Sequence, residues 1–289
     1  MNPRNLSRTL PTALLMTCLA ISGARAEFVL PRPSPAASVS QTIGVTNFTL
    51  SYSRPGVKGR AIWGGLVPHD STWRTGANEP SSLTVSDTVM VAGQKLPAGK
   101  YSILTIPGRG EWTVILSDQK DLQGSTNYDP SHDVLRTTSR PDTTQPHTEW
   151  MWLGFEDLTP SSASLVLRWE RLRLAVPITI DLNAVLLANA RREITNSDRD
   201  AWRNPLRAAT WCFDNSVALA EGAAWLEKSL AAQQNHANLS LKARWLAKDG
   251  KKAEAIATAR KAIDTGKAAK PPADTAPTEK LLAEWTAKK

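Results

Sequence analysis

The spacing of hydrophobic residues changes once along this chain, near Asp181. Between Ser38 and Asp181 the apolar residues form short runs bounded by turn residues, and in Phe48-Thr-Leu-Ser-Tyr52 they alternate with polar positions. Alternation places successive side chains on opposite faces of an extended strand. About eight such runs, joined roughly every 8–15 residues, predict an antiparallel β-sandwich over residues 38–181 rather than a closed barrel.

Turn residues inside this region predict particular strand pairs. Residues 100–106 and 112–116 are separated by Pro107-Gly-Arg-Gly-Glu111, where glycine can adopt the positive φ that a hairpin turn needs. We therefore expect these two strands to pair antiparallel. A second turn is expected at Ala92-Gly93.

The 11 tryptophans of the chain differ in their settings. Four lie within strand patterns and are expected to fill the core or cover a sheet edge: Trp112, Trp150, Trp152 and Trp169. Trp63 and Trp73 lie in glycine-rich loop sequence instead, where a ring could stack on a sugar or another planar group.

Beyond Asp181 the hydrophobic period is helical, and residues 220–230 align at an offset of 33 with residues 253–263. The small, large, turn, small and small positions of the second copy resemble those of a tetratricopeptide hairpin: Ala243, Leu246, Gly250, Ala255 and Ala262. We expect helical hairpins over residues 182–289, with residues 278–287 as a capping helix. Two repeats are few for such a stack, which favours a structural cap over a concave peptide-binding groove.

The first 26 residues have the pattern of a cleaved signal peptide. Arg4 and Arg8 precede the apolar run 10–21, and Ala24-Arg-Ala26 is a small-x-small cleavage site. The run is too short to span a bilayer as a helix, so we expect no transmembrane segment. The sequence predicts export to the periplasm or beyond, a mature terminus at Glu27 and a Pro-rich linker over residues 27–37. Lipid attachment at Cys18 is the less favoured alternative.

Composition and charge narrow the function classes. Removal of residues 1–26 leaves Cys212 alone, so the mature chain cannot close an internal disulfide. The net charge of the chain is +8, and the excess is concentrated in residues 182–289, which hold 18 Lys or Arg against 12 Asp or Glu. No phosphate loop or nucleic-acid motif accompanies it, so we interpret these charges as a solvated face, with no nucleic-acid partner.

One loop region concentrates side chains that are typical of ligand binding. Six residues are predicted to form a ligand-facing cluster: Arg54, Arg60, Trp73, Arg74, Asn78 and Glu79. Guanidinium groups can hold a carboxylate, sulfate or phosphate through two hydrogen bonds, an amide can bind a polar group and an indole ring can stack. The alternative is that these arginines brace turns through backbone carbonyls or pair with a carboxylate.

The sequence contains no motif of a known catalytic site, metal site or cofactor site. His69 lies beside Asp70, His132 lies near Asp129 and Asp133, and His147 lies near Glu149, but none has the spacing of a metal site or triad. We therefore expect a non-catalytic binding protein without metal or cofactor, whose β-sandwich binds a polar ligand, a glycan or a protein while the helical tail interacts with a partner protein. The alternative is a hydrolase of envelope or extracellular polymers, because triads can assemble from distant positions.

Four segments in order resemble the bacterial family called domain of unknown function 2911: residues 38–48, 52–60, 73–79 and 96–102. Trp112-Thr-Val-Ile-Leu116 also fits, and the resemblance covers roughly residues 36–181. Members of the family typically look exported, and many continue into a helical tail with a Trp-led segment like Trp202–Ala209. The resemblance implies an architecture and no established activity.

Overall fold

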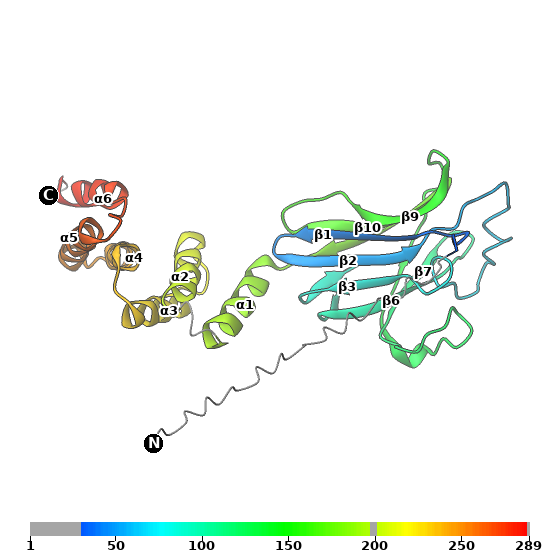
Figure 1. The fold of residues 1–289 in the computed structure, drawn as a ribbon, viewed down its shortest axis with the longest axis horizontal. Helices are drawn as coiled ribbons and strands as arrows, with labels where there is room; N and C mark the ends of the chain where they lie inside the picture. The colour runs from blue at the N-terminus through cyan, green and yellow to red at the C-terminus, as the bar shows by residue number, and fades with distance from the viewer. Residues whose placement is uncertain (1–29, 197–200, 288–289) are drawn as a thin grey trace, which may run out of the picture. The chain divides into compact units, whose positions relative to one another are not determined.

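The structure is a computed structural model that describes residues 30–196 and 201–287. Two antiparallel sheets form its first part, and helices follow, which confirms the predicted β-then-α architecture (Figure 1). The first sheet has the order β1-β2-β3-β6-β7-β8. Its strands are β1 (Ala36–Ile43), β2 (Thr46–Ser53), β3 (Ser82–Val85), β6 (Gly99–Ile106), β7 (Trp112–Ser117) and β8 (Asp133–Ser139).

The second sheet has the order β5-β4-β11-β10-β9. Its strands are β4 (Val89–Val91), β5 (Gln94–Leu96), β9 (Thr148–Glu156), β10 (Ser162–Glu170) and β11 (Leu172–Thr179). A short 3-10 helix, Pro130–His132, precedes β8.

The two predicted turns are present. β6 pairs antiparallel with β7, from Ser102 opposite Ser117 to Ile106 opposite Thr113. The connection does not use the positive φ expected at its glycines, because neither Gly108 nor Gly110 has one. Between β4 and β5, Ala92 and Gly93 have φ values of 47° and 76°. Positive φ at both turn positions matches the right-handed twist of the strands, so this two-residue connection keeps them in register.

The core lies between the sheets and is filled by alternate side chains of each strand. Phe48 and Leu50 on β2 and Leu167 and Trp169 on β10 are all buried. Trp112 is also buried in this core, as the strand pattern predicted. Trp150 is 38% exposed and lies at the sheet edge, where its backbone forms a bridge with Gly56.

The loop tryptophans pack against the same core. The Trp63 ring centroid lies 4.8 Å from that of Trp112 and 5.6 Å from that of Trp169, both edge-on. Trp73 stacks on Trp169 at 5.9 Å with an interplanar angle of 21°. The glycine-rich loop therefore folds back over one end of the sandwich, and both rings are partly buried there.

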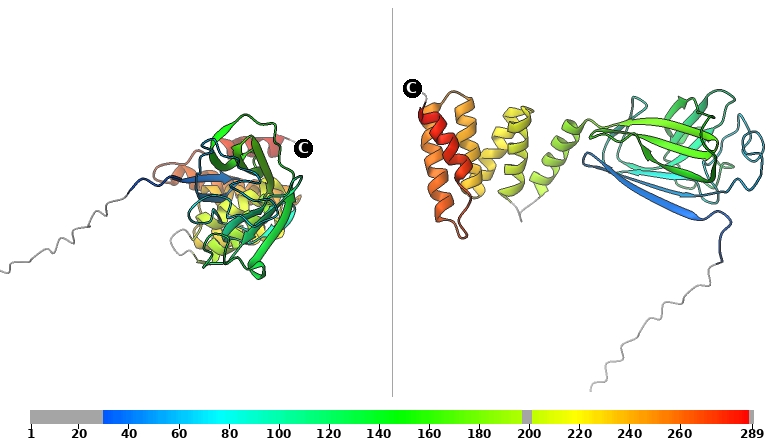
Figure 2. Two further views of the ribbon diagram at one scale, coloured as in Figure 1. Left: turned by 90° about the vertical axis from the view of Figure 1, so that its right-hand side faces the viewer. Right: turned by 90° about the horizontal axis from the view of Figure 1, so that it is seen from above.

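Six helices follow in the described part of the chain: α1 (Leu182–Asn196), α2 (Arg203–Asn215), α3 (Leu219–Ala232), α4 (His236–Lys248), α5 (Lys252–Ala268) and α6 (Ala276–Ala287). Figure 2 shows α2 with α3, and α4 with α5, side by side as hairpins. None of the helices within residues 30–196 and 201–287 has the length and apolar character needed to cross a bilayer.

Small residues let the paired helices approach closely. Ala255, Ala259 and Ala262 of α5 are fully buried, and Gly250, with φ of 77°, turns the chain between α4 and α5. In the α2–α3 hairpin, a Cβ on Gly222 would come within 2.6 Å of the Cys212 Cβ, so only glycine fits this contact.

Candidate functional site

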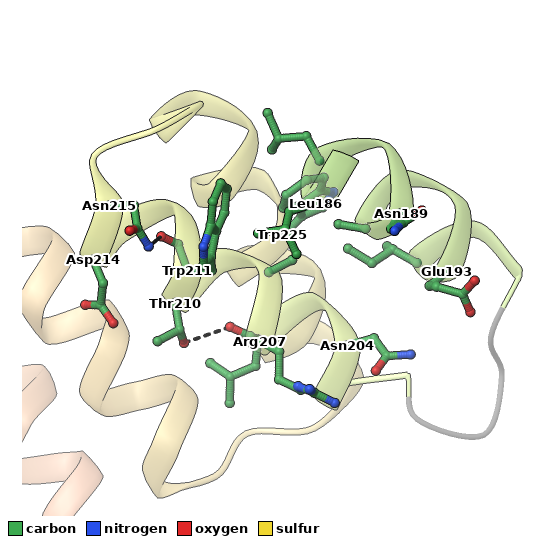
Figure 3. Close-up of a pocket in the computed structure, with 15 residues that line it drawn as sticks. Leu186, Asn189, Glu193, Asn204, Arg207, Thr210, Trp211, Asp214, Asn215 and Trp225 are labelled. Atoms are coloured by element: carbon green, nitrogen blue, oxygen red, sulfur yellow. Dashed lines mark hydrogen bonds between the residues drawn. The ribbon is translucent and has the colours of Figure 1, made fainter. Parts of the chain in front are cut away.

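A pocket of about 790 Å³ opens between α1, α2 and α3 (Figure 3). The helical period explains how the sequence builds it. On α2, Asn204, Arg207, Trp211 and Asp214 recur every three or four residues and line the pocket. The opposite face of α2 is buried in the hairpin, so this polar and aromatic stripe is left facing α1.

The α1 helix supplies the other wall. Leu187, Ala190 and Ile194 pack it against the core of the α2–α3 hairpin. Leu186 and the indole of Trp225 add further apolar surface to the pocket, whereas Asn189 and Glu193 place polar groups along it. The result is an apolar floor with a polar border.

Some polar groups of this border already have partners. The Asn215 amide donates to the Trp211 carbonyl at 2.9 Å, and the Thr210 hydroxyl donates to the Leu206 carbonyl at 2.8 Å. The Asp214 carboxylate accepts from Arg244 at 2.6 Å. These bonds stay within the helical tail and leave those groups less available to a ligand.

Three other polar side chains of the border have no internal partner in the described part of the chain. Asn189, Asn204 and Arg207 make no side-chain hydrogen bond or ion pair within the described residues. Amides can donate and accept, and a guanidinium can hold a carboxylate through two bonds. These groups can therefore meet a polar ligand without giving up an internal contact.

The buried cysteine of α2 is not suited to act as a nucleophile. Cys212 is buried, and burial raises the pKa of its thiol above the ordinary value, with the Glu221 charge acting in the same direction. A buried thiol with a raised pKa is a poor nucleophile at neutral pH.

Arg54 and Arg60, from the predicted cluster in the β region, contact backbone carbonyls. Arg54 Nε donates to the Met151 carbonyl at 2.8 Å and so joins the end of β2 to β9. Arg60 donates from Nε to the Val57 carbonyl at 3.1 Å and from Nη2 to the Gly56 carbonyl at 2.5 Å. Both contacts stabilise the local chain path.

Trp73 and Arg74 lie on a segment that pairs with β6. Trp73 and Thr105 exchange backbone hydrogen bonds of 2.7 and 2.9 Å, and the Trp73 indole donates to the Gly76 carbonyl at 3.1 Å. The Arg74 guanidinium lies against another loop, because a Cβ on Gly124 would come within 3.1 Å of its Nη1. Its Nε is buried and has no hydrogen-bond partner among the residues that the structure describes.

Asn78 contacts the end of β2, and Glu79 lies at a hollow of the surface. The Asn78 amide donates to the Ser53 hydroxyl at 3.1 Å and to the Ser34 carbonyl at 3.2 Å, and Asn78 has a φ of 57°. Glu79 borders a hollow of about 470 Å³ with Ser51 and Lys100. Asn78 therefore lies beside the segment that carries Arg54, whose N–H donates to the Pro35 carbonyl. The role of the six residues in ligand binding stays a prediction.

The histidines of the β region do not assemble a triad. His132 Nδ1 lies 3.0 Å from Asp118 Oδ1 and His147 Nε2 lies 3.3 Å from Glu149 Oε2, with all four side chains about half exposed. His69 Nδ1 is buried and has no hydrogen-bond partner in the described part of the chain. Among the described residues, none of these histidines contacts a hydroxyl or thiol nucleophile, and no group of three His, Cys, Asp or Glu could hold a metal ion.

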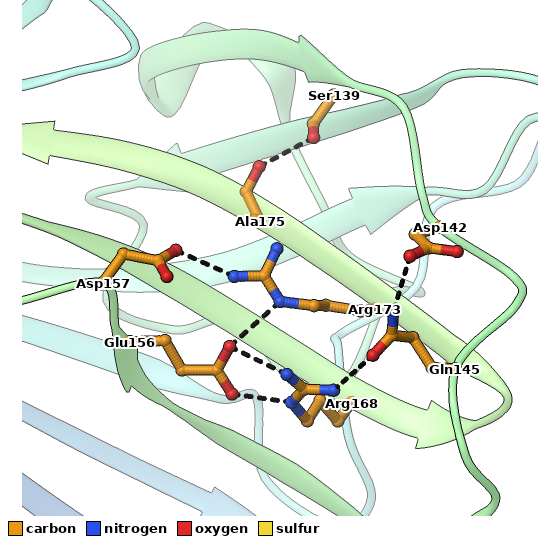
Figure 4. Close-up of polar contacts among 8 residues, drawn as sticks. All are labelled: Ser139, Asp142, Gln145, Glu156, Asp157, Arg168, Arg173 and Ala175. Carbon is orange, nitrogen blue, oxygen red and sulfur yellow. Dashed lines mark hydrogen bonds and ion pairs between the residues drawn. The ribbon is translucent and has the colours of Figure 1, made fainter.

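A polar network on the second sheet escaped the sequence analysis (Figure 4). Arg168 on β10 lies directly opposite Arg173 on β11, so their charges would repel. Glu156 on β9 accepts from Arg168 at 2.6 and 2.9 Å and from Arg173 at 2.9 Å. Arg168 also donates to Gln145 at 2.9 Å, which ties the loop before β9 to the sheet.

The opposite charges of this network compensate one another. The hydrogen bonds that Arg168 donates to Glu156 lower the pKa of the Glu156 carboxyl below its ordinary value, although partial burial opposes the shift. Since the carboxylate bridges both guanidinium groups, the network is a structural brace. Recognising this network requires the register of β9, β10 and β11 relative to one another. That register cannot be read from any one segment of the sequence.

These observations define an antiparallel β-sandwich with a helical tail that carries a pocket. The chain belongs to the family described as Protein of unknown function (DUF2911), whose model matches residues 34–178. This match confirms the resemblance seen in the sequence motifs. No curated protein and no solved structure matches the chain.

Proposed function

We propose that this protein is an exported, non-catalytic binding protein whose helical tail holds a short peptide segment of a partner protein. One observation carries the proposal. The pocket between α1, α2 and α3 combines an apolar floor with Asn189, Asn204 and Arg207, whose side chains make no polar contact within the described residues.

The amides favour a peptide in an extended form. An extended segment presents backbone N–H and C=O groups, and each amide side chain offers both a donor and an acceptor. Asn189 lies on α1 and Asn204 lies on α2, so the two amides belong to different walls. The pocket volume of about 790 Å³ lies within the usual range for ligand sites.

The floor and the charges specify the segment further. Leu186, Trp211 and Trp225 offer a surface for one apolar side chain. Asp214 is paired with Arg244, and Glu193 lies 3.3 Å from Arg192, whereas Arg207 has no carboxylate partner in the described part of the chain. We therefore propose a segment with an apolar residue and a nearby acidic group or terminal carboxylate.

Export is part of this proposal and rests on the sequence. Arg4, Arg8, the apolar run 10–21 and the cleavage pattern Ala24-Arg-Ala26 support a signal peptide and a mature terminus at Glu27. These residues lie outside the described part of the structure. A partner in the periplasm or outside the cell follows from this proposal, and mass spectrometry of the exported chain tests it.

The sandwich is proposed as a second binding region, for a polar ligand or glycan. Arg74 supports this best, because its guanidinium makes no ion pair or hydrogen bond within residues 30–196 and 201–287. Glu79 and Lys100 border a hollow that could hold a small polar molecule.

Peptide binding by the pocket is tested with an array of short peptides that vary one apolar and one acidic position. The strongest binder is then titrated by calorimetry into the mature chain. Trp211→Ala should weaken binding about tenfold or more, because aromatic anchors dominate such contacts. Arg207→Ala should weaken selectively the peptides that carry the acidic group.

Trp285→Ala is the matched control, because Trp285 lies on α6 and does not line the pocket. It should leave the dissociation constant unchanged, and circular dichroism should show that all variants are folded. If no peptide binds, or if the Trp211→Ala and Trp285→Ala variants bind the peptide equally well, the pocket is not a peptide-binding site.

A further inference from the structure

The two sheets have four edge strands, and three of them are protected. β5 has only three residues and carries Lys95. β8 carries Asp133 and Arg136. Short length and charge both discourage pairing with another strand.

The edge of β9 is covered by the chain itself. The Val57 N–H donates to the Glu149 carbonyl at 2.8 Å, and the Met151 N–H donates to the Pro55 carbonyl at 3.0 Å. The segment after β2 therefore occupies hydrogen-bonding positions that another strand would need.

β1 has none of these protections. It spans eight residues, Ala-Ala-Ser-Val-Ser-Gln-Thr-Ile, with no charge, proline or glycine. It is the outer strand of the six-stranded sheet and, among the described strands, pairs only with β2. A long, uncharged edge of this kind is suited to pairing with a further strand.

The register shows which backbone groups face the open edge. The Arg54 N–H donates to the Pro35 carbonyl at 2.9 Å, and Val39 pairs with Leu50 four residues further along. Hydrogen-bonded pairs alternate in an antiparallel ladder, so Val39 turns its N–H and C=O toward β2. Ser38 and Ser40 therefore turn theirs away from β2, and both residues are exposed.

These outward groups have almost no partners. Of the outward backbone groups of the even-numbered residues 36–42, only the Thr42 carbonyl has a partner within the described residues, and it accepts from the Gln41 side-chain amide at 2.9 Å. The N–H groups of Ser38 and Ser40 remain available along the edge.

We propose that β1 pairs antiparallel with β1 of a second copy of this chain. The six-stranded sheets of the two copies are then joined across a two-fold axis. With the axis near Val39, Ser38 lies opposite Ser40 of the other copy, and Ala36 lies opposite Thr42. All four residues turn their N–H and C=O groups outward, so the strand is complementary to itself in this register.

The charge pattern of β1 is compatible with self-pairing. In this register no like charges are brought together, because β1 carries no charged residue. A two-fold contact also closes after two copies and leaves no free β1 edge.

The full mature chain is tested by sedimentation velocity across a dilution series, which should show a monomer–dimer equilibrium. Ser40→Pro removes one outward N–H from each copy and should weaken the dimer about tenfold or more. Hydrogen exchange supplies a second measurement. The Ser38 and Ser40 amides should exchange more slowly at high protein concentration, whereas the Val39 amide should not change.

A charge variant guards against misfolding of the proline variant. Ser38→Lys combined with Ser40→Lys places like charges opposite each other and should give a folded monomer. Ser51→Lys is the control, because Ser51 is exposed on β2, opposite Ser38 and away from the edge. A wild-type chain that stays monomeric throughout, or a dimer that survives both edge variants, would overturn the proposal.

Discussion

The loops of the sandwich and the pocket of the helical tail both collect arginine, tryptophan and asparagine, but they use these residues differently. In the loops, Arg54 donates to the Met151 carbonyl and the Trp73 ring stacks on Trp169. In the pocket, Arg207 and Asn204 make no side-chain polar contact among the described residues. A high density of arginine, tryptophan and asparagine can therefore indicate either a structural brace or a binding site. Polar side chains without internal partners beside an apolar surface favour a binding site.

The largest expected difference concerns tryptophan. Trp169 is fully buried between the sheets, and Trp169→Ala should lower the free energy of unfolding by about 3–5 kcal/mol. Trp211→Ala removes a partly exposed ring and should cost about 1–2 kcal/mol. Urea titrations of both variants measure this, and equal losses would break the contrast between core and pocket.

The next effect concerns the charge network of the second sheet. Glu156→Gln leaves Arg168 and Arg173 opposite each other without their shared carboxylate. Hydrogen bonds to charged groups contribute about 1.5–3 kcal/mol, but these side chains are about a quarter exposed, so we expect a loss of about 1–2 kcal/mol. Glu227→Gln, at the exposed pair with Lys242, should change stability little.

The same carboxylate gives a pH dependence. Because the pKa of Glu156 is lowered in the folded chain, its contribution is present above the unfolded value of about 4.3 and is lost as the pH falls through the lower folded pKa. Stability should therefore fall with acidification below about pH 4.3, and less steeply in Glu156→Gln. Parallel acid curves for the two proteins would contradict this.

The smallest expected effect is that of Arg74→Ala. Without an ion pair in the described residues, Arg74 should contribute at most about 1 kcal/mol to stability. Thermal unfolding of the variant would then match the parent closely, while any anion or glycan binding by the sandwich would be lost. A loss of about 3–5 kcal/mol would instead identify Arg74 as one half of a buried ion pair.

What the sequence could predict was local. The β6–β7 hairpin and the Ala92-Gly93 turn follow from neighbouring residues, because turn residues constrain the backbone directly. The position of Trp73 depends on the pairing of its segment with Thr105, which lies more than thirty residues away. Glycine-rich sequence shows no alternation, so this strand-like segment could not be recognised as part of a sheet.

The pocket depended on a third helix. The repeat predicted the hairpins from their small residues, and these bury one face of α2. The opposite face, with Trp211 and Arg207, becomes a pocket only because α1 packs beside it. The α1 helix has no counterpart in the aligned repeat, so the repeat could not predict this pocket, and the small number of repeats favoured a cap over a groove.

One helix contributes to the core of the sandwich and to the core of the α2–α3 hairpin. Val185 of α1 is buried with the sandwich residues, while Leu187, Ala190 and Ile194 of the same helix pack with α2 and α3. The family match ends at residue 178, before this helix begins. A gene fusion that exchanged tails at that boundary would remove Val185 from the sandwich core, whereas a crossover after α1 would remove one wall of the pocket. Natural or engineered recombinants should therefore tolerate a crossover only if the helix at this position fits both the sandwich and the α2–α3 hairpin.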